Sequence, residues 1–401
     1  MSAPRVAPDD KDWWLDDVES VYAWLRANEP VREWRPGRWV VASYDEIREV
    51  SRDASRFSSV HGVLPSDPKR GTSPKRAAAA PSILEMDPPE HPRYRAIVSR
   101  AFTPRAVAAM EPHIRALASA VLDRVPADEA VDFVERVAVP LPLLVIAELL
   151  GMRDVEQRQF RRWSDETIKA ADRLEADMDV MAEFVAFMTE GIAAHRSHPR
   201  DDILQKLVDA EVDGERLTDP ELLVFCMSLL VAGNETTRNL ISGAALVLHE
   251  HPDQRGWLAA DPAGRVTGAV EELLRWVTPV KAFGRTAVHD TELGGRPIPA
   301  DDYVIMLYAS GNRDERAFGP TAGRVDVQRV PDPAHMAFGF GPHLCLGASL
   351  ARLEARALLE ELLLRCPDYA ITGPPRRLRS TLMNGIEALP VVLAPSGRAV
   401  A

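Results

Sequence analysis

The stretch "HMAFGFGPHLCLGASLARLEA", residues 335–355, places a cysteine and three glycines at the start of an amphipathic helix. Leu346, Leu350 and Leu353 recur at the spacing of a helix face that packs against a core. Cys345 stands at the start of this helix, where the helix dipole and the free backbone N–H groups favour a thiolate. The glycines let a flat group lie close to the chain. The stretch therefore predicts a reactive or ligating sulfur at Cys345.

Three kinds of chemistry use a cysteine sulfur in this way. Zinc usually takes three or four protein ligands, and no nearby pair of Cys or His has the spacing of a zinc site. A nucleophile needs a positioned base, and His343, two residues from Cys345, keeps that possibility open. Haem iron brings four nitrogens and needs one axial protein ligand, for which a thiolate is a known choice. The residues alone favour haem.

Composition places the chain among folded, acidic proteins. Of its 401 residues 46% are hydrophobic, and the formal net charge of −12 argues against non-specific nucleic-acid binding. Three cysteines cannot form a disulfide framework and indicate a reducing compartment. The N-terminus lacks a signal-peptide pattern, and the longest apolar-leaning run, 137–152, is shorter than the ~20 residues of a membrane span. We expect a cytoplasmic protein without a membrane anchor.

Helical patterns dominate the chain. Apolar spacing near 3.6 residues predicts helices at 44–52, 104–124, 141–150, 154–170, 174–196, 220–250, 263–277 and 346–365. Strand-like segments are short and lie at 38–42, 283–289, 303–307 and 389–393. The pattern predicts a mainly α fold, in which one large helical domain carries a small β-rich part.

The helix at 220–250 changes character halfway along. With Asp219 as its expected N-cap it would span about 46 Å, enough to cross a whole domain. Its first part is apolar almost all round, and "AGNETTRN", residues 232–239, then makes it polar. A buried carboxylate is costly unless it is paired, and a threonine can bond back to a carbonyl one turn earlier. We expect a local distortion and a polar pocket there, the alternative being a helix that surfaces at residue 233.

The motif Phe338-Gly339-x-Gly341-x-His343-x-Cys345-x-Gly347 resembles the haem-binding signature of the cytochrome P450 family. The similarity extends over nearly all of the chain. It implies a single domain, 1–401, with a β-rich part mainly from 30–60, 283–310 and 375–397. The helical haem-binding part would come from 87–280 and 335–366. The implied cofactor is haem b, with Cys345 as the axial ligand of its iron.

The resemblance assigns further residues. Glu272 and Arg275 in "EELLRW" are similar to a buried acid–arginine pair whose third member is Arg329, a network that holds the cysteine loop. "AGNETTRN" matches the oxygen-activation signature, with Gly233 at the haem face and Glu235 and Thr236 as the catalytic acid–alcohol pair that guides protons.

Basic and donor side chains are implied partners of the haem propionates, because they suit carboxylates through charge-assisted hydrogen bonds. These residues are His91, Arg95, Arg285 and His343. Phe338, Gly339 and Gly347 complete the implied haem-binding loop. An ordinary surface base is the alternative for each of the cationic residues.

The implied reaction inserts one oxygen atom from dioxygen into a C–H bond and releases the other as water. The chain has no flavin or iron–sulfur segment, so a separate ferredoxin and its ferredoxin reductase should supply electrons. Arg352, Arg356 and Arg365 are candidates for docking an acidic partner, and a solvated helix face is the alternative. A protein that binds ligand or rearranges substrate without oxygen insertion is a second possibility, against which the intact Glu235–Thr236 pair argues. A helical scaffold without haem is a third.

The expected substrate is a hydrophobic small molecule, such as a sterol, branched lipid, terpenoid or polyketide-like compound, since most implied pocket positions are apolar. These positions are Leu229, Val280, Lys281, Ala282, Phe283, Leu382 and Met383, together with the loop 62–84. The irregular basic stretch 67–82 is either a solvated loop or a lid. Lys281 could anchor an acidic substrate group, although the more favoured interpretation is that it points past the pocket or pairs with a propionate.

Overall fold

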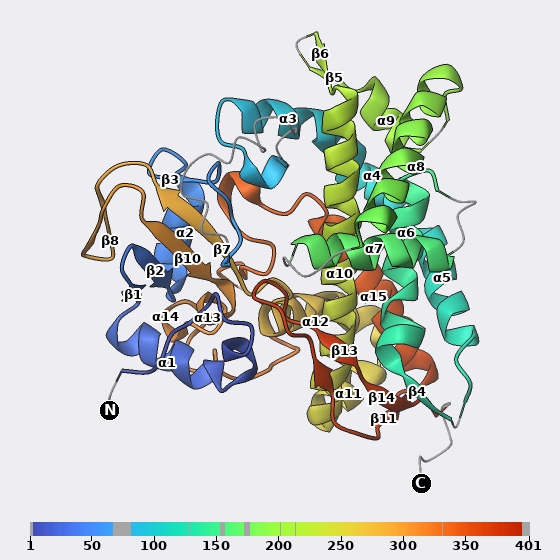
Figure 1. The fold of residues 1–401 in the computed structure, drawn as a ribbon. Coiled ribbons are helices and arrows are strands. Elements are labelled where there is room, and N and C mark those ends of the chain that lie inside the picture. Colours follow the sequence, from blue (N-terminus) through green and yellow to red (C-terminus); the bar gives the residue numbers. More distant parts are fainter. Residues whose placement is uncertain are drawn as a thin grey trace.

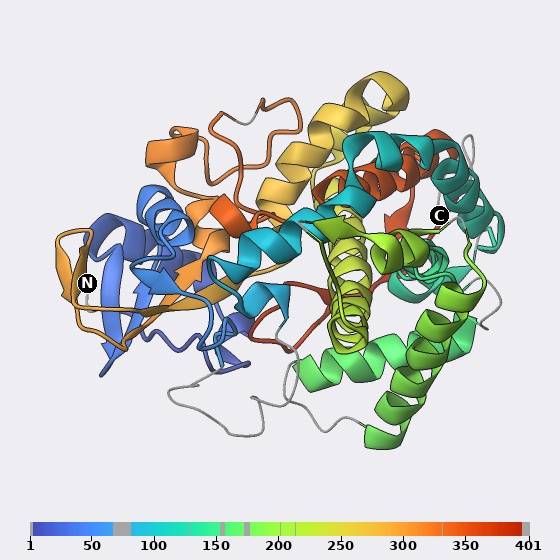
Figure 2. The ribbon, with the colours of Figure 1, turned by 90° about the horizontal axis from the view of Figure 1, so that it is seen from above.

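The computed structural model describes residues 3–66, 82–127, 129–152, 157–171, 177–200, 202–212, 214–330 and 332–394. Figure 1 shows a smaller part built around a β-sheet, which carries the N-terminus, beside a larger part made of helices. The same two parts lie side by side when the molecule is seen from above in Figure 2. This arrangement agrees with the mainly α fold expected from the sequence.

The smaller part is organised by a five-stranded sheet of order β1-β2-β10-β7-β3. Its strands are β1 (Val31–Arg35), β2 (Arg38–Val41), β10 (Tyr303–Leu307), β7 (Ala282–Ala287) and β3 (Phe57–Ser58). β10 runs parallel to β2 and antiparallel to β7, so two distant segments of the chain meet at its centre.

Alternating side chains of the sheet enter two separate cores. Val41, Val304 and Met306 pack with α2 (Tyr44–Arg52) in one of them. Val40 and Ile305 pack on the other face, together with the N-terminal segment and α1 (Val18–Asn28). This alternation follows from the period of two along a strand, and it fixes which neighbours each residue can reach.

Helices build the larger part. Those before the long central helix are α3 (Glu90–Ser99), α4 (Pro104–Ala109), α5 (Glu111–Asp123), α6 (Pro140–Leu149), α7 (Gln157–Ala171), α8 (Met178–Ser197) and α9 (Ile203–Asp209). Those after it are α11 (Pro252–Ala259), α12 (Pro262–Val277), α13 (Tyr308–Gly311), α14 (Glu315–Phe318) and α15 (Ala348–Arg365). None of the helices among the described residues is both long and apolar enough to pass through a membrane.

Short strands and single turns complete the fold. A three-stranded sheet has the order β11 (Ala370–Ile371), β14 (Pro390–Val392), β4 (Ala130–Asp132). The remaining pairs are β5 (Glu211–Val212) with β6 (Glu215–Arg216), β8 (Thr291–Leu293) with β9 (Arg296–Ile298), and β12 (Arg376–Arg377) with β13 (Ile386–Ala388). The turns are η1 (Trp13–Leu15), η2 (Ile83–Glu85), η3 (Arg100–Phe102), the π-helical η4 (Val134–Ala138) and η5 (Gly341–His343).

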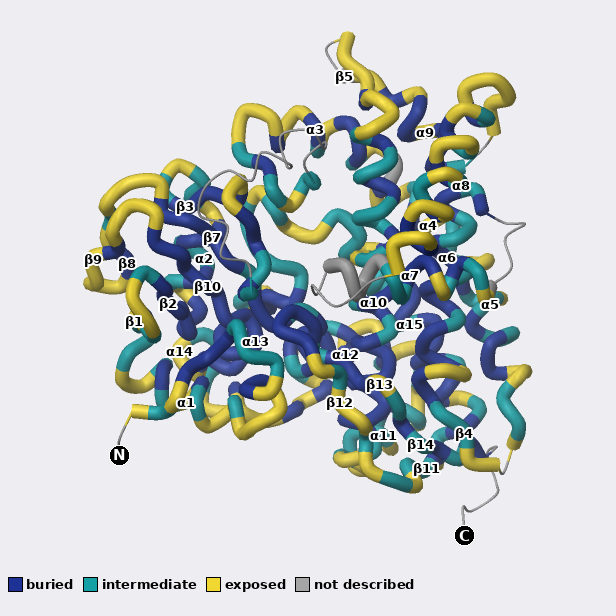
Figure 3. The backbone as a smooth tube through the Cα atoms, viewed as in Figure 1, coloured by how far each residue is buried: buried dark blue, intermediate teal, exposed yellow. Residues whose placement is uncertain are grey.

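The central helix α10 (Asp219–Glu250) contacts α6, α7, α8, α12 and α15. Figure 3 shows buried backbone where the lower half of this helix meets α12 and α15. Thr218, not Asp219, is the N-cap, because its side chain accepts from the Glu221 N–H while the Glu221 carboxylate accepts from the Thr218 N–H. The helix is also unbroken through residues 232–239, so the expected distortion does not interrupt it.

Most other predicted elements are present with small shifts at their ends. The helix expected at 104–124 is wrong as a single element, since it divides at Met110 into α4 and α5, and Pro112 lies in the first turn of α5. The starts of the helices expected at 154–170 and 174–196 lie partly outside the described residues. The same is true of the basic stretch 67–82, apart from its last residue.

Candidate functional site

The cysteine loop, residues 335–347, is a compact turn that leads into α15. Gly339 and Gly341 have φ angles of 69° and 71°, in the left-handed region that favours glycine. The Cys345 N–H donates to the Phe338 carbonyl over 2.9 Å and closes the loop. Cys345 is exposed and stands three residues before the first residue of α15. The loop thus presents its sulfur at a helix start, as its sequence predicts.

His343 is not placed to act as a base for Cys345, and burial opposes the thiolate that the helix start was expected to favour. Protein atoms around the sulfur raise the pKa of the thiol, while the Gly347 N–H and the charges of Arg95 and Arg352 act in the opposite direction. His343 is turned elsewhere, since its Nε2 lies 3.2 Å from the Ser59 hydroxyl. Burial, followed by nearby positive charges, lowers the pKa of His343 to about 3. The base that a nucleophilic cysteine needs is therefore missing from this position.

Four of the predicted donors form one group, here called the cationic cluster: His91, Arg95, Arg285 and His343. The rings of His91 and His343 are 4.1 Å apart. Burial lowers the pKa of His91, and the positive charges of Arg95 and Arg285 lower it further. His91 is buried, and neither of its ring nitrogens has a hydrogen-bond partner in the described protein. Each positive charge in this cluster makes the others less favourable. A negatively charged group bound from outside the chain would relieve that repulsion and accept hydrogen bonds from these donors.

The polar part of α10 is buried at Asn234, Glu235, Thr237 and Asn239, although Ala232 is exposed, so Glu235 does not lie in water as the alternative of a surfacing helix requires. Glu235 is completely buried and pairs with Arg238 at 2.6 Å, and the Asn239 amide donates to it over 3.0 Å. Arg238 also lies 3.9 Å from Asp165 on α7. Burial raises the pKa of Glu235, and Arg238 and Asn239 partly offset the effect. A carboxyl of raised pKa is thus held inside the fold.

Two neighbours of Glu235 clarify how the helix accommodates its polar residues. The Thr236 hydroxyl donates to the Ala232 carbonyl over 2.6 Å, the back-bond expected from the sequence. A Cβ atom at Gly233 would lie 2.3 Å from Ile146 Cδ1, so the glycine lets α10 and α6 approach closely. Close packing against α6 therefore accounts for a glycine at position 233. Its place at a haem face stays a prediction.

The predicted acid–arginine network is present. Arg275 binds both oxygens of Glu272 at 2.7 Å, and both side chains are completely buried. Arg329 completes it, with Nε 3.3 Å from Glu272. Arg275 also donates to the Asn312 carbonyl, and the Asn312 side chain accepts from the Met336 N–H over 2.6 Å. The network thereby reaches the cysteine loop through Asn312, a residue that the sequence analysis missed.

A second brace of the cysteine loop was also missed. Glu271 binds Arg352 at 2.6 Å and His335 at 3.2 Å. The Arg352 guanidinium lies 4.5 Å from the ring centre of Phe338. Burial acts to raise the pKa of Glu271, but the bonds from Arg352 and His335 outweigh it and bring the pKa to about 2. The adjacency of Glu271 to Glu272 was the available signal, since neighbouring helix residues face different partners.

Comparisons with known proteins agree with this geometry. A family model described as "Cytochrome P450" matches residues 266–368. Steroid C26-monooxygenase of Mycobacterium tuberculosis is 36% identical over 404 residues, which cover 98% of this chain and 98% of that relative. The chain belongs to the cytochrome P450 family. Because such relatives match over nearly their whole length, this P450 is a monooxygenase.

Two further relatives of this P450 extend the comparison. Methyl-branched lipid omega-hydroxylase of Mycobacterium bovis is 38% identical over 403 residues, covering 95% of this chain and 92% of that protein. The solved structure of a cytochrome P450 from Chondromyces apiculatus matches with a TM-score of 0.88 at 35% identity. That match covers 98% of this chain and 99% of the other, so the P450 fold expected from the sequence is confirmed.

Membership of the family implies a thiolate-ligated haem, and the residues present fit one. Cys345 offers a single free thiol on an exposed residue, and a thiolate-ligated haem needs one protein sulfur. The cationic cluster contains buried imidazole nitrogens without partners, which suit the carboxylates of a haem. No group of three or more His, Cys, Asp or Glu that could hold a metal ion by itself occurs among the described residues.

The two segments expected to line the substrate pocket of this P450 lie next to each other. Val280 and Met383 form an isolated antiparallel bridge, and the Lys281 N–H donates to the Leu382 carbonyl over 2.8 Å. Phe283 packs edge-on against Tyr308, with ring centres 6.2 Å apart. The structure thus brings together segments a hundred residues apart.

Three other pocket expectations have different outcomes. The buried Lys281 donates from Nζ to the Ser380 carbonyl over 2.9 Å and lies 5.1 Å from the ring centre of Trp14, which favours the interpretation that it points past the pocket. Ala282 does not face a pocket, because its side chain is completely buried in the core beside Trp13 and Trp14. Leu229 is half-buried on α10, next to a Ser228 hydroxyl 3.3 Å from that of Ser82.

The arginines of α15 that were expected to dock a partner each pair with a carboxylate of this chain. Arg352 binds Glu271, Arg356 binds Glu111 at 2.6 Å, and Arg365 binds Asp123 at 2.7 Å. Each charge is therefore already matched by a carboxylate of the same chain. A docking role for these three residues stays a prediction.

Proposed function

We propose that this P450 hydroxylates an unactivated C–H bond of a sterol or a branched lipid. Its cofactor is haem b, held by Cys345, and its electrons come from a ferredoxin and a ferredoxin reductase. The observation that carries the proposal is the convergence of an exposed Cys345 with the cationic cluster, beside a helix that buries Glu235.

The cysteine loop and the cationic cluster together would hold the haem. The Cys345 thiolate would bind the haem iron, and Phe338, Gly339 and Gly347 would shape the loop around it. His91, Arg95, Arg285 and His343 would bind the haem carboxylates as hydrogen-bond donors. When bound, a thiolate-ligated haem activates dioxygen so that one oxygen atom enters the substrate and the other leaves as water.

Glu235 and Thr236 would handle the protons that this reaction consumes. Burial raises the pKa of Glu235, which favours the protonated form of a carboxyl that could pass a proton on. Arg238, which lies between Glu235 and the half-exposed Asp165, offers a route for exchange with solvent. The Thr236 hydroxyl donates to the Ala232 carbonyl, so its oxygen is free to accept a hydrogen bond.

The substrate class is proposed from the side chains that face one another at the bridge between 280–283 and 382–383, and from the named relatives. Val280, Phe283, Leu382 and Met383 are apolar and offer no charged group to a ligand. An apolar lining with few polar groups favours a hydrophobic substrate. Relatives named for steroids and for methyl-branched lipids support these two classes.

The proposal is tested by product analysis with isotopically labelled dioxygen. The purified holoenzyme, a surrogate ferredoxin and its reductase are incubated with a panel of sterols and branched lipids. We expect one labelled oxygen atom per product, and a Glu235→Gln variant should yield far less product while binding the same compounds. Rearranged products without label would instead support the alternative of isomerisation, and binding without any product would support a ligand-binding protein.

A further inference from the structure

One face of α2 lies along the cysteine loop. The Tyr44 hydroxyl donates to the Ala334 carbonyl over 2.6 Å, just before the loop begins. Ile47 and Met336 pack in the same core, one turn further along the helix. α2 also contacts η5, the turn that precedes Cys345. Because residues three and four apart share a helix face, the next positions on this face are Arg48, Ser51 and Arg52.

Phe340 is held between two guanidinium groups of this face. The Arg48 guanidinium lies 4.8 Å from the ring centre of Phe340, and that of Arg52 lies 4.6 Å from it. Such distances are those of a cation–π interaction. Phe340 occupies a position that the haem-binding motif leaves variable, so the signature itself does not account for this contact.

The adjacent glycine is pressed against the backbone of α2. A Cβ atom at Gly341 would lie 2.5 Å from the Ser51 carbonyl oxygen, and no side chain there could move aside. Phe340 and Gly341 are thus fixed together, Phe340 by side chains and Gly341 by close backbone packing. Cys345 follows four residues after Gly341, on the far side of η5.

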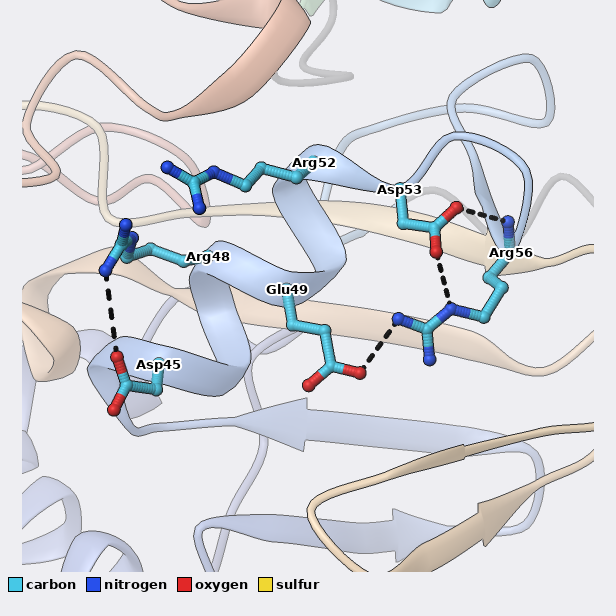
Figure 4. A pocket seen from close by; sticks show the side chains of 6 residues that line it. All are labelled: Asp45, Arg48, Glu49, Arg52, Asp53 and Arg56. Atoms are coloured by element: carbon cyan, nitrogen blue, oxygen red, sulfur yellow. Dashed lines mark hydrogen bonds and ion pairs between the residues drawn. The ribbon is translucent and has the colours of Figure 1, made fainter.

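The charges on α2 leave Arg52 available for this contact. A cavity of about 400 Å³ is lined by side chains from α2 and the turn after it. Figure 4 shows these residues, which are Asp45, Arg48, Glu49, Arg52, Asp53 and Arg56. Glu49 and Asp53 both pair with Arg56, whereas Arg48 reaches Asp45 only at 3.9 Å. Arg48 and Arg52 extend to the same side, away from Glu49 and Asp53. No ion pair among the described residues involves Arg52.

We propose that Arg48 and Arg52 are positioning residues, which clamp Phe340 and so hold the cysteine loop in the geometry that places the Cys345 sulfur on the haem iron. The inference rests on the proposed haem site. It predicts that loosening the clamp lets the thiolate leave the iron more often, without changing which groups touch the haem.

The test is the rate at which the reduced carbon-monoxide complex of the holoenzyme loses its thiolate-type Soret band in mild denaturant. We expect Arg48→Ala/Arg52→Ala and Phe340→Ala each to raise this rate about tenfold, since two exposed cation–π contacts contribute about that much. Phe340→Tyr keeps the ring and should restore the wild-type rate. Combining Phe340→Ala with the arginine changes should add little, because both remove the same contact.

Arg56→Ala is the matched control. Arg56 lines the same cavity and lies 5.3 Å from the ring centre of Phe57, but its side chain donates hydrogen bonds to Asp53, Glu49 and the Glu292 carbonyl rather than to the cysteine loop. It should lower the midpoint of thermal unfolding and leave the spectral rate unchanged. Equal rates for Arg56→Ala and the clamp variants would overturn the proposal. A wild-type protein without a thiolate-type band would instead overturn the haem site itself, so the two failures are distinguishable.

Discussion

In this P450, sequence patterns predict side-chain positions better around Cys345, here called the cysteine side, than at 280–283 and 382–383, here called the substrate side. Near Cys345, the predicted Glu272, Arg275 and Arg329 form one network. On the substrate side, Lys281 and Ala282 belong to a segment predicted to line the pocket, but their side chains turn toward the N-terminal residues. On the cysteine side, binding a cofactor requires particular atoms at particular positions, and this requirement restricts which residues can stand there. On the substrate side, the lining needs only to be apolar, and side chains in many orientations meet that requirement.

The largest expected effect comes from breaking the buried pair behind the cysteine loop. Glu272→Gln leaves the completely buried Arg275 without a counter-charge, and we expect a loss of about 3–5 kcal/mol in the free energy of unfolding. Urea denaturation measures it. The control is Arg376→Leu, which breaks an exposed pair with Glu387 and should cost less than about 1 kcal/mol. Similar losses in both variants would remove the contrast between buried and exposed pairs.

Glu235→Gln should separate proton handling from substrate binding. We expect turnover to fall about a hundredfold, because the amide cannot give up a proton, while the substrate-induced spectral shift keeps its affinity. Steady-state kinetics and spectral titration on one preparation measure both. Glu250→Gln, an exposed carboxylate at the end of the same helix, should change neither quantity. Unchanged turnover in Glu235→Gln would exclude this residue from the reaction.

Glu271 should make the cysteine loop sensitive to acid. Its folded pKa, about 2, lies below the ordinary 4.5, so its pairing stabilises the fold above pH 4.5 and is lost as the pH falls from 4.5 toward 2. Glu271→Gln should therefore lower stability by about 2 kcal/mol at neutral pH, a difference that shrinks across this acidic window. Thermal unfolding at a series of pH values measures it. A difference that is constant with pH would contradict the assigned role.

The smallest effect is expected at Lys281. Because its ammonium is bound to the Ser380 carbonyl and lies over Trp14, Lys281→Leu should leave the relative affinities for a substrate acid and its methyl ester unchanged. Spectral titration with both compounds measures this ratio. A selective loss of affinity for the acid would show that Lys281 does reach the substrate. Sequence patterns would then predict side chains on the substrate side as well as on the cysteine side.

The parts of the fold that could be predicted are those with a strong local signal. α2, α10 and α12 begin and end within one residue of their predicted bounds, because their apolar spacing and end residues agree. The break at Met110 was missed, since "AVAAMEPHIRAL" keeps its apolar spacing across the junction. The N-cap was misplaced by one residue because Thr218 and Asp219 are both good caps, and only the bond from Thr218 to Glu221 decides between them.

The residues that could not be predicted act through contacts between distant segments. Asn312 and Glu271 have ordinary sequence surroundings, and their roles depend on Met336, His335 and Arg352 being brought to them by the fold. The same holds for α2, whose arginines meet Phe340 from almost three hundred residues away. Periodicity identifies which face of a helix is buried, but it does not identify the partner.

The central claim is that Cys345 binds haem iron as a thiolate in a P450 monooxygenase. The most direct measurement is the carbon-monoxide difference spectrum of the reduced protein, compared among the wild type, Cys345→Ala and Cys366→Ala. We predict the red-shifted Soret band of thiolate ligation in the wild type and in Cys366→Ala, and its complete loss in Cys345→Ala. A wild type without this band, or a Cys345→Ala variant that keeps it, would contradict the account.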